Sequence, residues 1–215
     1  MSNPVASPKI FGIGFQKTAT TTLCTAFRLL GYKMEGGSKH LIPSLRRGDL
    51  APTFEVADRN EAFDDNPWPL IYPELDARYP GSKFILTVRD EKEWLQSVVN
   101  HLGFGPDPMQ KLVYGVGFPV GFEDVFIERY RRHNREVQAY FADRPKDLLV
   151  VDFCAGAGWE ELCTFLQRDI PDEPFPHSFK GTYTPSKSRS RRVVSKVIHG
   201  LRRVVGRDGT VTWQA

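Results

Sequence analysis

The chain lacks the features that mark secreted and membrane-spanning proteins. Only three of its 215 residues are cysteines. Cys24, Cys154 and Cys163 have no metal-ligand spacing, and their odd number argues against a disulfide framework, so we expect a reducing compartment. No apolar run is long enough to cross a bilayer, and the first eight residues, MSNPVASP, lack the apolar stretch of a signal peptide. These absences predict a cytoplasmic protein.

Excess positive charge is also absent from most of the chain. The formal net charge is +3, but residues 187–207 contain eight Lys or Arg, opposed nearby only by Asp208. The remainder is therefore mildly acidic, which predicts no nucleic-acid partner. We expect two parts, a domain over residues 1–185 and a basic C-terminal tail over residues 186–215.

The tail has the pattern of a basic amphipathic helix. Seven apolar residues recur at helical spacing between Val193 and Val205, with basic residues towards the other side, although Gly200 weakens the pattern. Such a helix can make peripheral contact with an anionic membrane surface. Docking on the domain and the absence of folding are the alternatives.

Short apolar runs alternate with helical patterns in the first 176 residues. We expect strands at 9–14, 53–56, 83–88 and 147–153. Helices are expected at 20–30, 38–50, 69–78, 91–102, 123–141 and 158–167, and the Gly- and Pro-rich residues 103–121 are expected to form a long loop over a site. This order predicts a three-layer, P-loop-like α/β fold in which helices flank a mostly parallel central sheet.

Residues 12–23, GIGFQKTATTTL, lead from the first strand into the first helix. The N–H groups at the start of a helix bind anions, and the positive end of the helix dipole favours them. Lys17 adds a mobile positive charge, and hydroxyl donors follow at Thr18, Thr20, Thr21 and Thr22. The segment therefore predicts a site for a phosphate or a phosphosulfate, unless the threonines only cap the helix.

The segment departs from the loop of nucleotide triphosphatases, G-x-x-x-x-G-K-[ST]. Counted from Gly12, the second glycine and the lysine fall out of register, and Gln16 replaces the glycine expected before the lysine. The tighter loop suits a 5′-phosphate with one attached group better than a triphosphate with magnesium.

GFQKTATTTL resembles the 5′-phosphosulfate loop of sulfotransferases that use 3′-phosphoadenosine-5′-phosphosulfate (PAPS). KFILTVRDEKEWLQS adds an Arg at the end of a strand and a Ser eight positions later, Arg89 and Ser97, the pair with which that family binds the 3′-phosphate. The similarity extends over about residues 9–178 and is greatest to a compact branch related to the carbohydrate-type enzymes.

The resemblance implies a sulfuryl transfer from PAPS, without a metal, to a hydroxyl or amine of a small-molecule or carbohydrate acceptor. The donor-binding residues that it implies are Gln16, Lys17, Thr18, Ala19, Thr20, Thr21, Thr22, Arg89 and Ser97. A guanidinium at the carboxyl end of a parallel strand also suits bidentate phosphate binding on physical grounds. A salt bridge from Arg89 to Asp90 or Glu93 is the alternative.

Two residues are the candidates for chemistry. Lys17 is assigned to the leaving oxygen, and Asp65 to the acceptor's proton, because adjacent carboxylates at 64 and 65 can raise each other's pKa. The family's D-x-P pattern also falls on Asp65. Asp64 and His40 are the alternative bases, and Asp65 can instead cap the helix that follows.

Two other functions remain open at this stage. One is an ATP-dependent P-loop kinase, and the other is a non-catalytic nucleotide-binding scaffold. His133, in ERYRRHN, is expected on a solvated helix face.

Overall fold

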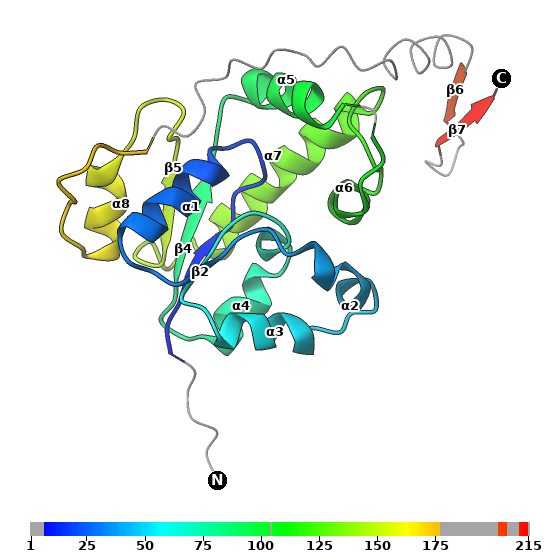
Figure 1. Cartoon of the computed structure of the whole chain (residues 1–215). Coiled ribbons are helices and arrows are strands. Elements are labelled where there is room, and N and C mark those ends of the chain that lie inside the picture. The colour runs from blue at the N-terminus through cyan, green and yellow to red at the C-terminus, as the bar shows by residue number, and fades with distance from the viewer. Residues whose placement is uncertain (1–6, 104, 177–201, 206–210, 215) are drawn as a thin grey trace. The chain divides into compact units, whose positions relative to one another are not determined.

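The computed structural model describes residues 7–103, 105–176, 202–205 and 211–214. The chain divides into two compact units, Met1–Gly181 and Thr182–Ala215. The first unit contains a central sheet surrounded by helices (Figure 1).

All five strands of this sheet are parallel, and their order is β2-β3-β1-β4-β5. The strands are β1 (Ile10–Gly12), β2 (Met34–Glu35), β3 (Ala62–Phe63), β4 (Lys83–Thr87) and β5 (Leu148–Val151). The helices are α1 (Thr20–Leu29), α2 (Ile42–Arg46), α3 (Ala51–Asp58), α4 (Tyr72–Arg78), α5 (Glu91–Leu102), α6 (Pro108–Tyr114), α7 (Glu123–Tyr140) and α8 (Trp159–Leu166), with two 3-10 helices, η1 (Lys39–Leu41) and η2 (Trp68–Leu70). The predicted α/β class is confirmed.

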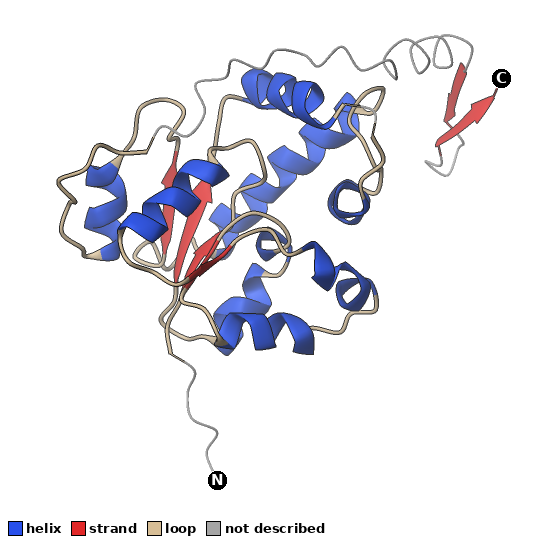
Figure 2. Ribbon diagram, viewed as in Figure 1, coloured by secondary structure: helices blue, strands red, loops and turns tan. Residues whose placement is uncertain are grey.

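Different helices cover the two faces of the sheet (Figure 2). Successive residues of a strand point to opposite faces, so in β1 the side chain of Ile10 packs with α1 and α8, and that of Phe11 packs with α3, α4 and α7. Parallel sheets are covered on both faces. These two apolar clusters join the sheet to a layer of helices on each face, which gives the fold its three layers.

A third apolar cluster lies around the segment that follows β1. It joins Phe15 to residues of α2, α5, α6 and α7. Within it, Trp94 of α5 stacks on Tyr130 of α7 with ring centroids 4.2 Å apart. Helices far apart in sequence are thereby packed against the segment between β1 and α1.

The strand expected at residues 53–56 is wrong, because these residues lie in α3. Pro52 occupies the first turn of that helix, where proline is well tolerated. Thr53 and Ala57 are buried four positions apart, which is a helical spacing. The strand of this region is β3, which has only two residues.

The loop expected at residues 103–121 is also corrected, since it contains α6. Asp107 caps this helix by accepting hydrogen bonds from the N–H groups of Met109 and Gln110, and Pro108 occupies the first turn. The Asp-Pro pair is a helix-start signal that the glycine and proline content of the segment obscured.

The second unit contains an antiparallel pair, β6 (Arg202–Val205) and β7 (Val211–Gln214). The expected amphipathic helix is therefore wrong for residues 202–205, and its remainder lies outside the described residues. Among the described residues, no helix combines the length and apolar character needed to span a membrane.

One close contact in the first unit yields a stability prediction. A Cβ on Gly14 would lie 2.9 Å from the backbone nitrogen of Thr87 and closer still to the hydroxyl and carbonyl oxygens of that residue. We expect Gly14→Ala to lower the free energy of unfolding by more than about 2 kcal/mol, measured by urea denaturation. Gly36→Ala is the control, because no atom lies within 4 Å of its Cβ position. Equal effects of the two substitutions would contradict the prediction.

Candidate functional site

The segment between β1 and α1 begins where β1 and β4 lie side by side in the sheet. The chain runs from β1 to α1 and β2 on one side of this pair, and from β4 to β5 on the other. Open α/β sheets bind ligands at such a switch point, outside the carboxyl ends of the strands. The Ile13 N–H donates to the Ile85 carbonyl oxygen over 2.8 Å, which extends the strand pairing into the segment.

The start of α1 has no side-chain cap. Its N-cap residue is Ala19, which makes no side-chain capping hydrogen bond. The structure therefore gives no support to the alternative in which threonines only cap this helix. N–H groups of the first helical turn have no partner within the helix and are available to an anion.

Two non-glycine residues of the segment have left-handed backbones. Lys17 and Ala19 both have φ of 70°. This conformation costs on the order of 1–3 kcal/mol for a residue with a side chain, and such residues concentrate at ligand sites.

The side chains of the predicted donor-binding residues between β1 and α1 do not all face the same way. The Thr18 hydroxyl is buried and donates to the Phe15 carbonyl oxygen over 2.6 Å, and it lies 2.6 Å from the Thr87 hydroxyl. Gln16 is also buried. Lys17 and Ala19 are half-buried, Thr20 and Thr22 are buried, and Thr21 is exposed. The side chains of Gln16 and Thr18 thus support the loop from inside.

The charges of Lys17 and Arg89 act on each other. Burial lowers the pKa of Lys17, and the positive charge of Arg89 lowers it further, while the carboxylate of Asp65 opposes both. Arg89 follows β4, so the carboxyl ends of two adjacent strands bring the two cations together. Two neighbouring positive charges attract anions.

Arg89 is held by Glu93 in this structure. The Arg89 Nη2 atom lies 3.2 Å from Glu93 Oε2, the salt bridge that the sequence left as an alternative. Because the Glu93 side chain is 63% exposed, the pair is weak and open to competition by a phosphate. Ser97, the other predicted 3′-phosphate residue, is half-buried in α5, eight positions after Arg89.

The structure separates the two candidate carboxylates. Asp64 is fully buried against Gly12, and its Oδ1 atom has no hydrogen-bond partner. Burial and the charge of Asp65 raise the pKa of Asp64 well above its ordinary value. A fully buried carboxyl is out of reach of an acceptor, which argues against Asp64 as the base.

Asp65 is half-buried and has a left-handed backbone with φ of 68°. Burial raises its pKa, and a hydrogen bond from the Asn66 N–H over 2.7 Å opposes this, as do the positive charges of Lys39 and Lys17. A carboxylate with a raised pKa beside Lys17 has the properties of a general base.

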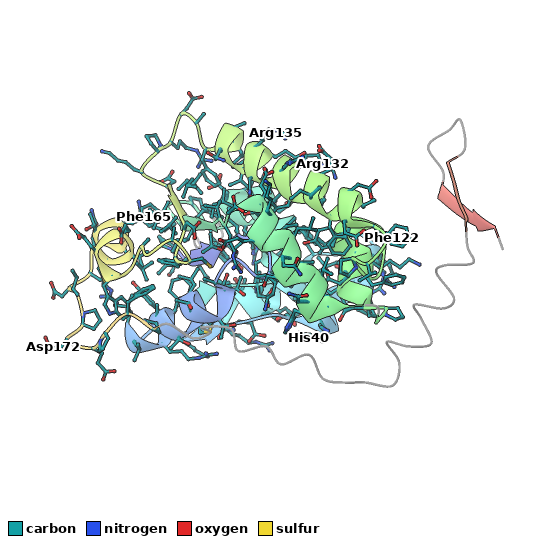
Figure 3. The ribbon with its side chains drawn as sticks, turned by 90° about the horizontal axis from the view of Figure 1, so that it is seen from above. His40, Phe122, Arg132, Arg135, Phe165 and Asp172 are labelled. Carbon is teal, nitrogen blue, oxygen red and sulfur yellow. The ribbon has the colours of Figure 1, made fainter. Side chains whose placement is uncertain are left out.

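Sequence reasoning missed two basic residues of the site. Lys39, in η1, and His101, in the last turn of α5, both act on the carboxylate of Asp65. Burial lowers the pKa of His101, and the charge of Lys17 lowers it further. No local motif indicates either residue, because their proximity depends on how the helices pack. The alternative base His40 is exposed (Figure 3).

His133 is a correction, because it is 1% exposed. Its Nε2 atom lies 2.7 Å from the Ile13 carbonyl oxygen, and its ring stacks on Phe15 with centroids 4.2 Å apart. Its neighbours Arg132 and Arg135 lie on the outer side of α7 (Figure 3). The charged residues around His133 in the sequence hid its inward position.

Comparison with known proteins identifies the family of the chain. The sequence profile of the family described as "Sulfotransferase domain" matches residues 9–183. The chain belongs to the sulfotransferase domain family. It is also similar to "Ava biosynthesis cluster protein M" of Aspergillus versicolor, with 24% identity over 220 residues, 79% of this chain and 80% of the relative.

Within the described parts of the chain, no group of three or more His, Cys, Asp or Glu is arranged to hold a metal ion.

The burial of His133 predicts a pH dependence of stability. Burial lowers the pKa of His133 to about 4, so the unfolded chain binds a proton there that the folded chain does not. Stability present above pH 6.5 is therefore lost as the pH falls towards 4, by roughly 3 kcal/mol. The free energy of unfolding, measured with urea between pH 7 and 4.5, should therefore fall by less in His133→Gln than in the wild type. Gln138→Ala, an exposed change on the same helix, should follow the wild type, and parallel curves for His133→Gln would refute the assignment.

Asp64 predicts the opposite dependence. The pKa of Asp64 is higher in the folded protein than in the unfolded chain, so the folded protein binds a proton there more tightly. The stability that this proton adds is complete below the pKa of the unfolded chain and is lost as the pH rises through the pKa of the folded protein. Asp64→Asn has nearly the same shape and no charge. We expect the variant to gain stability over the wild type, by an amount larger at pH 8 than at pH 5 in urea unfolding. A difference that does not change with pH would show that Asp64 does not titrate in this way.

Proposed function

We propose that this chain is a PAPS-dependent sulfotransferase that transfers a sulfuryl group to a hydroxyl or amine of a small-molecule or carbohydrate acceptor. The observation that carries the proposal is the pair of interacting cations, Lys17 and Arg89, beside the uncapped start of α1. The nucleotide of PAPS carries separate anionic groups at its 3′ and 5′ positions, which suits two cations on adjacent strand ends.

In the proposed site each element binds one part of the donor. The first turn of α1 and Lys17 bind the 5′-phosphate, and Arg89 with Ser97 binds the 3′-phosphate. A phosphate at Arg89 competes with Glu93 for the guanidinium. The donor supplies a sulfuryl group that is already activated by its link to phosphate.

The transfer itself depends on position and charge. Lys17 stabilises the negative charge that develops on the leaving oxygen. Asp65 accepts the proton of the acceptor, and its raised pKa favours this role near neutral pH. Because the sulfuryl group carries less charge than a transferred phosphoryl group, the two cations meet the need that a divalent metal meets in kinases.

The relative's name bears on the class of acceptor. The relative from Aspergillus versicolor is named for a biosynthesis cluster. For this chain we propose a small metabolite as the acceptor. A screen of phenols, alcohols, amines and sugars with labelled PAPS tests the acceptor class, and transfer to proteins alone would overturn it.

Calorimetric titration tests donor binding. We expect adenosine 3′,5′-bisphosphate to bind, and Lys17→Met and Arg89→Met each to weaken its binding about tenfold or more, since each removes a charge-assisted contact. Lys92→Met is the control, because Lys92 is an exposed residue of α5 three positions after Arg89. This substitution should change the affinity by no more than about twofold.

Two results would contradict the proposal. Tight binding of ATP–magnesium without binding of the bisphosphate would favour the kinase. Binding of the bisphosphate without transfer to any acceptor, and with no role for Lys17 beyond affinity, would favour a nucleotide-binding scaffold.

A further inference from the structure

We propose that Gln16 is a positioning residue that transmits occupation of the donor loop to the segment bearing Asp65. This inference rests on the proposed function. The Gln16 side chain is 7% exposed and points into the protein. Its Oε1 atom accepts a hydrogen bond from Asn66 Nδ2 over 2.8 Å. Gln16 precedes Lys17 and Asn66 follows Asp65, so this bond joins the two segments that carry the chemistry.

The other side-chain contacts fix the orientation of the Gln16 amide. Its Nε2 atom donates to the Tyr114 hydroxyl over 2.6 Å and to Gln110 Oε1 over 3.3 Å, both in α6. With both amide hydrogens used on that side, the Gln16 oxygen faces Asn66.

The backbone of Gln16 is held as well. Its carbonyl oxygen accepts a hydrogen bond from Trp94 Nε1 over 2.9 Å. Trp94 lies in α5, the helix that follows Arg89 and carries Ser97. One residue therefore contacts α5, which carries Ser97, the helix α6, and the segment that bears Asp65.

Asn66 in turn holds the position of Asp65. Its backbone N–H donates to Asp65 Oδ1 over 2.7 Å, and its carbonyl oxygen accepts from the Ser38 N–H over 3.1 Å. Asn66 is 4% exposed. A displacement of the loop at Lys17 therefore reaches the carboxylate through two hydrogen bonds, Gln16 to Asn66 and Asn66 to Asp65.

The amide is chemically suited to this role. The Gln16 amide donates to Tyr114 through its nitrogen and accepts from Asn66 through its oxygen, so the same end of one side chain binds both partners. The glycine of the triphosphatase loop would leave the buried Asn66 amide without this partner, and buried polar groups are rarely left unpaired. Because a misplacement of about 1 Å can cost on the order of 10²-fold in rate, such a link matters for Asp65.

Hydrogen exchange of backbone amides tests the link without an identified acceptor. The probe is adenosine 3′,5′-bisphosphate at saturation. In the wild type we expect slower exchange in residues 14–22, where it binds, and in residues 63–70, to which Gln16 transmits the effect. Gln16→Met keeps the length of the side chain but loses its hydrogen bonds. This variant should keep the slowing in residues 14–22, which also shows that it is folded, and lose at least half of the slowing in residues 63–70.

Two further variants separate the link from a general loss of structure. Tyr114→Phe removes the shorter of the two contacts from Gln16 to α6 and keeps the bond to Asn66, so the slowing in residues 63–70 should persist. Gln16→Glu can still accept from Asn66 Nδ2, so at saturation it should retain the response that Gln16→Met loses, although its charge weakens binding.

Each outcome decides one question. Equal slowing of residues 63–70 in the wild type and Gln16→Met would overturn the role of Gln16, as would slowing confined to residues 14–22 in the wild type. A wild type in which neither segment responds would instead overturn the proposed binding of the donor nucleotide, and with it this inference.

Discussion

The arrangement of the site depends on the close approach of Gly14 to Thr87. Only a residue without a side chain lets the segment after β1 lie against the end of β4. That approach brings Arg89, two residues beyond Thr87, to the same edge of the sheet as Lys17. If the segment moved away from β4 by the width of a methyl group, Lys17 would lie further from Arg89.

Buried polar contacts then hold the segment from inside the protein. The hydroxyls of Thr18 and Thr87 pair with each other, the ring of His133 binds the Ile13 carbonyl, and the indole of Trp94 binds the Gln16 carbonyl. Each of these groups would cost free energy if it were buried alone. Together they fix backbone positions before any ligand arrives, and such preorganisation is the main electrostatic resource of an active site.

The sequence predicted the layers of this fold and the segments that build the site, because both follow from local patterns. The strand at β4 and the helices α1, α5 and α7 have strong periodicity, and Lys17, Asp65 and Arg89 lie within motifs. Residues 53–56 were mistaken for a strand, since a short apolar run fits either structure.

Features that arise only from packing were not accessible in this way. His133 lies in a run of charged residues, and only the packing of α7 against Phe15 turns it inward. Lys39 and His101 come near Asp65 through the placement of η1 and α5, which no spacing encodes. The inward direction of Gln16 likewise depends on α6, a helix whose capping signal was present at Asp107 but lay within a segment that resembled a loop.

The mutual repulsion of Lys17 and Arg89 has a consequence for how the protein behaves in solution. A pair of cations that raises the energy of the empty protein attracts whatever small oxyanion the medium offers, and inorganic phosphate and sulfate have the right charge. Buffers that contain these ions should therefore compete with the proposed nucleotide, and the attraction should weaken as ionic strength rises. The ionic composition around the protein thus becomes part of its apparent activity.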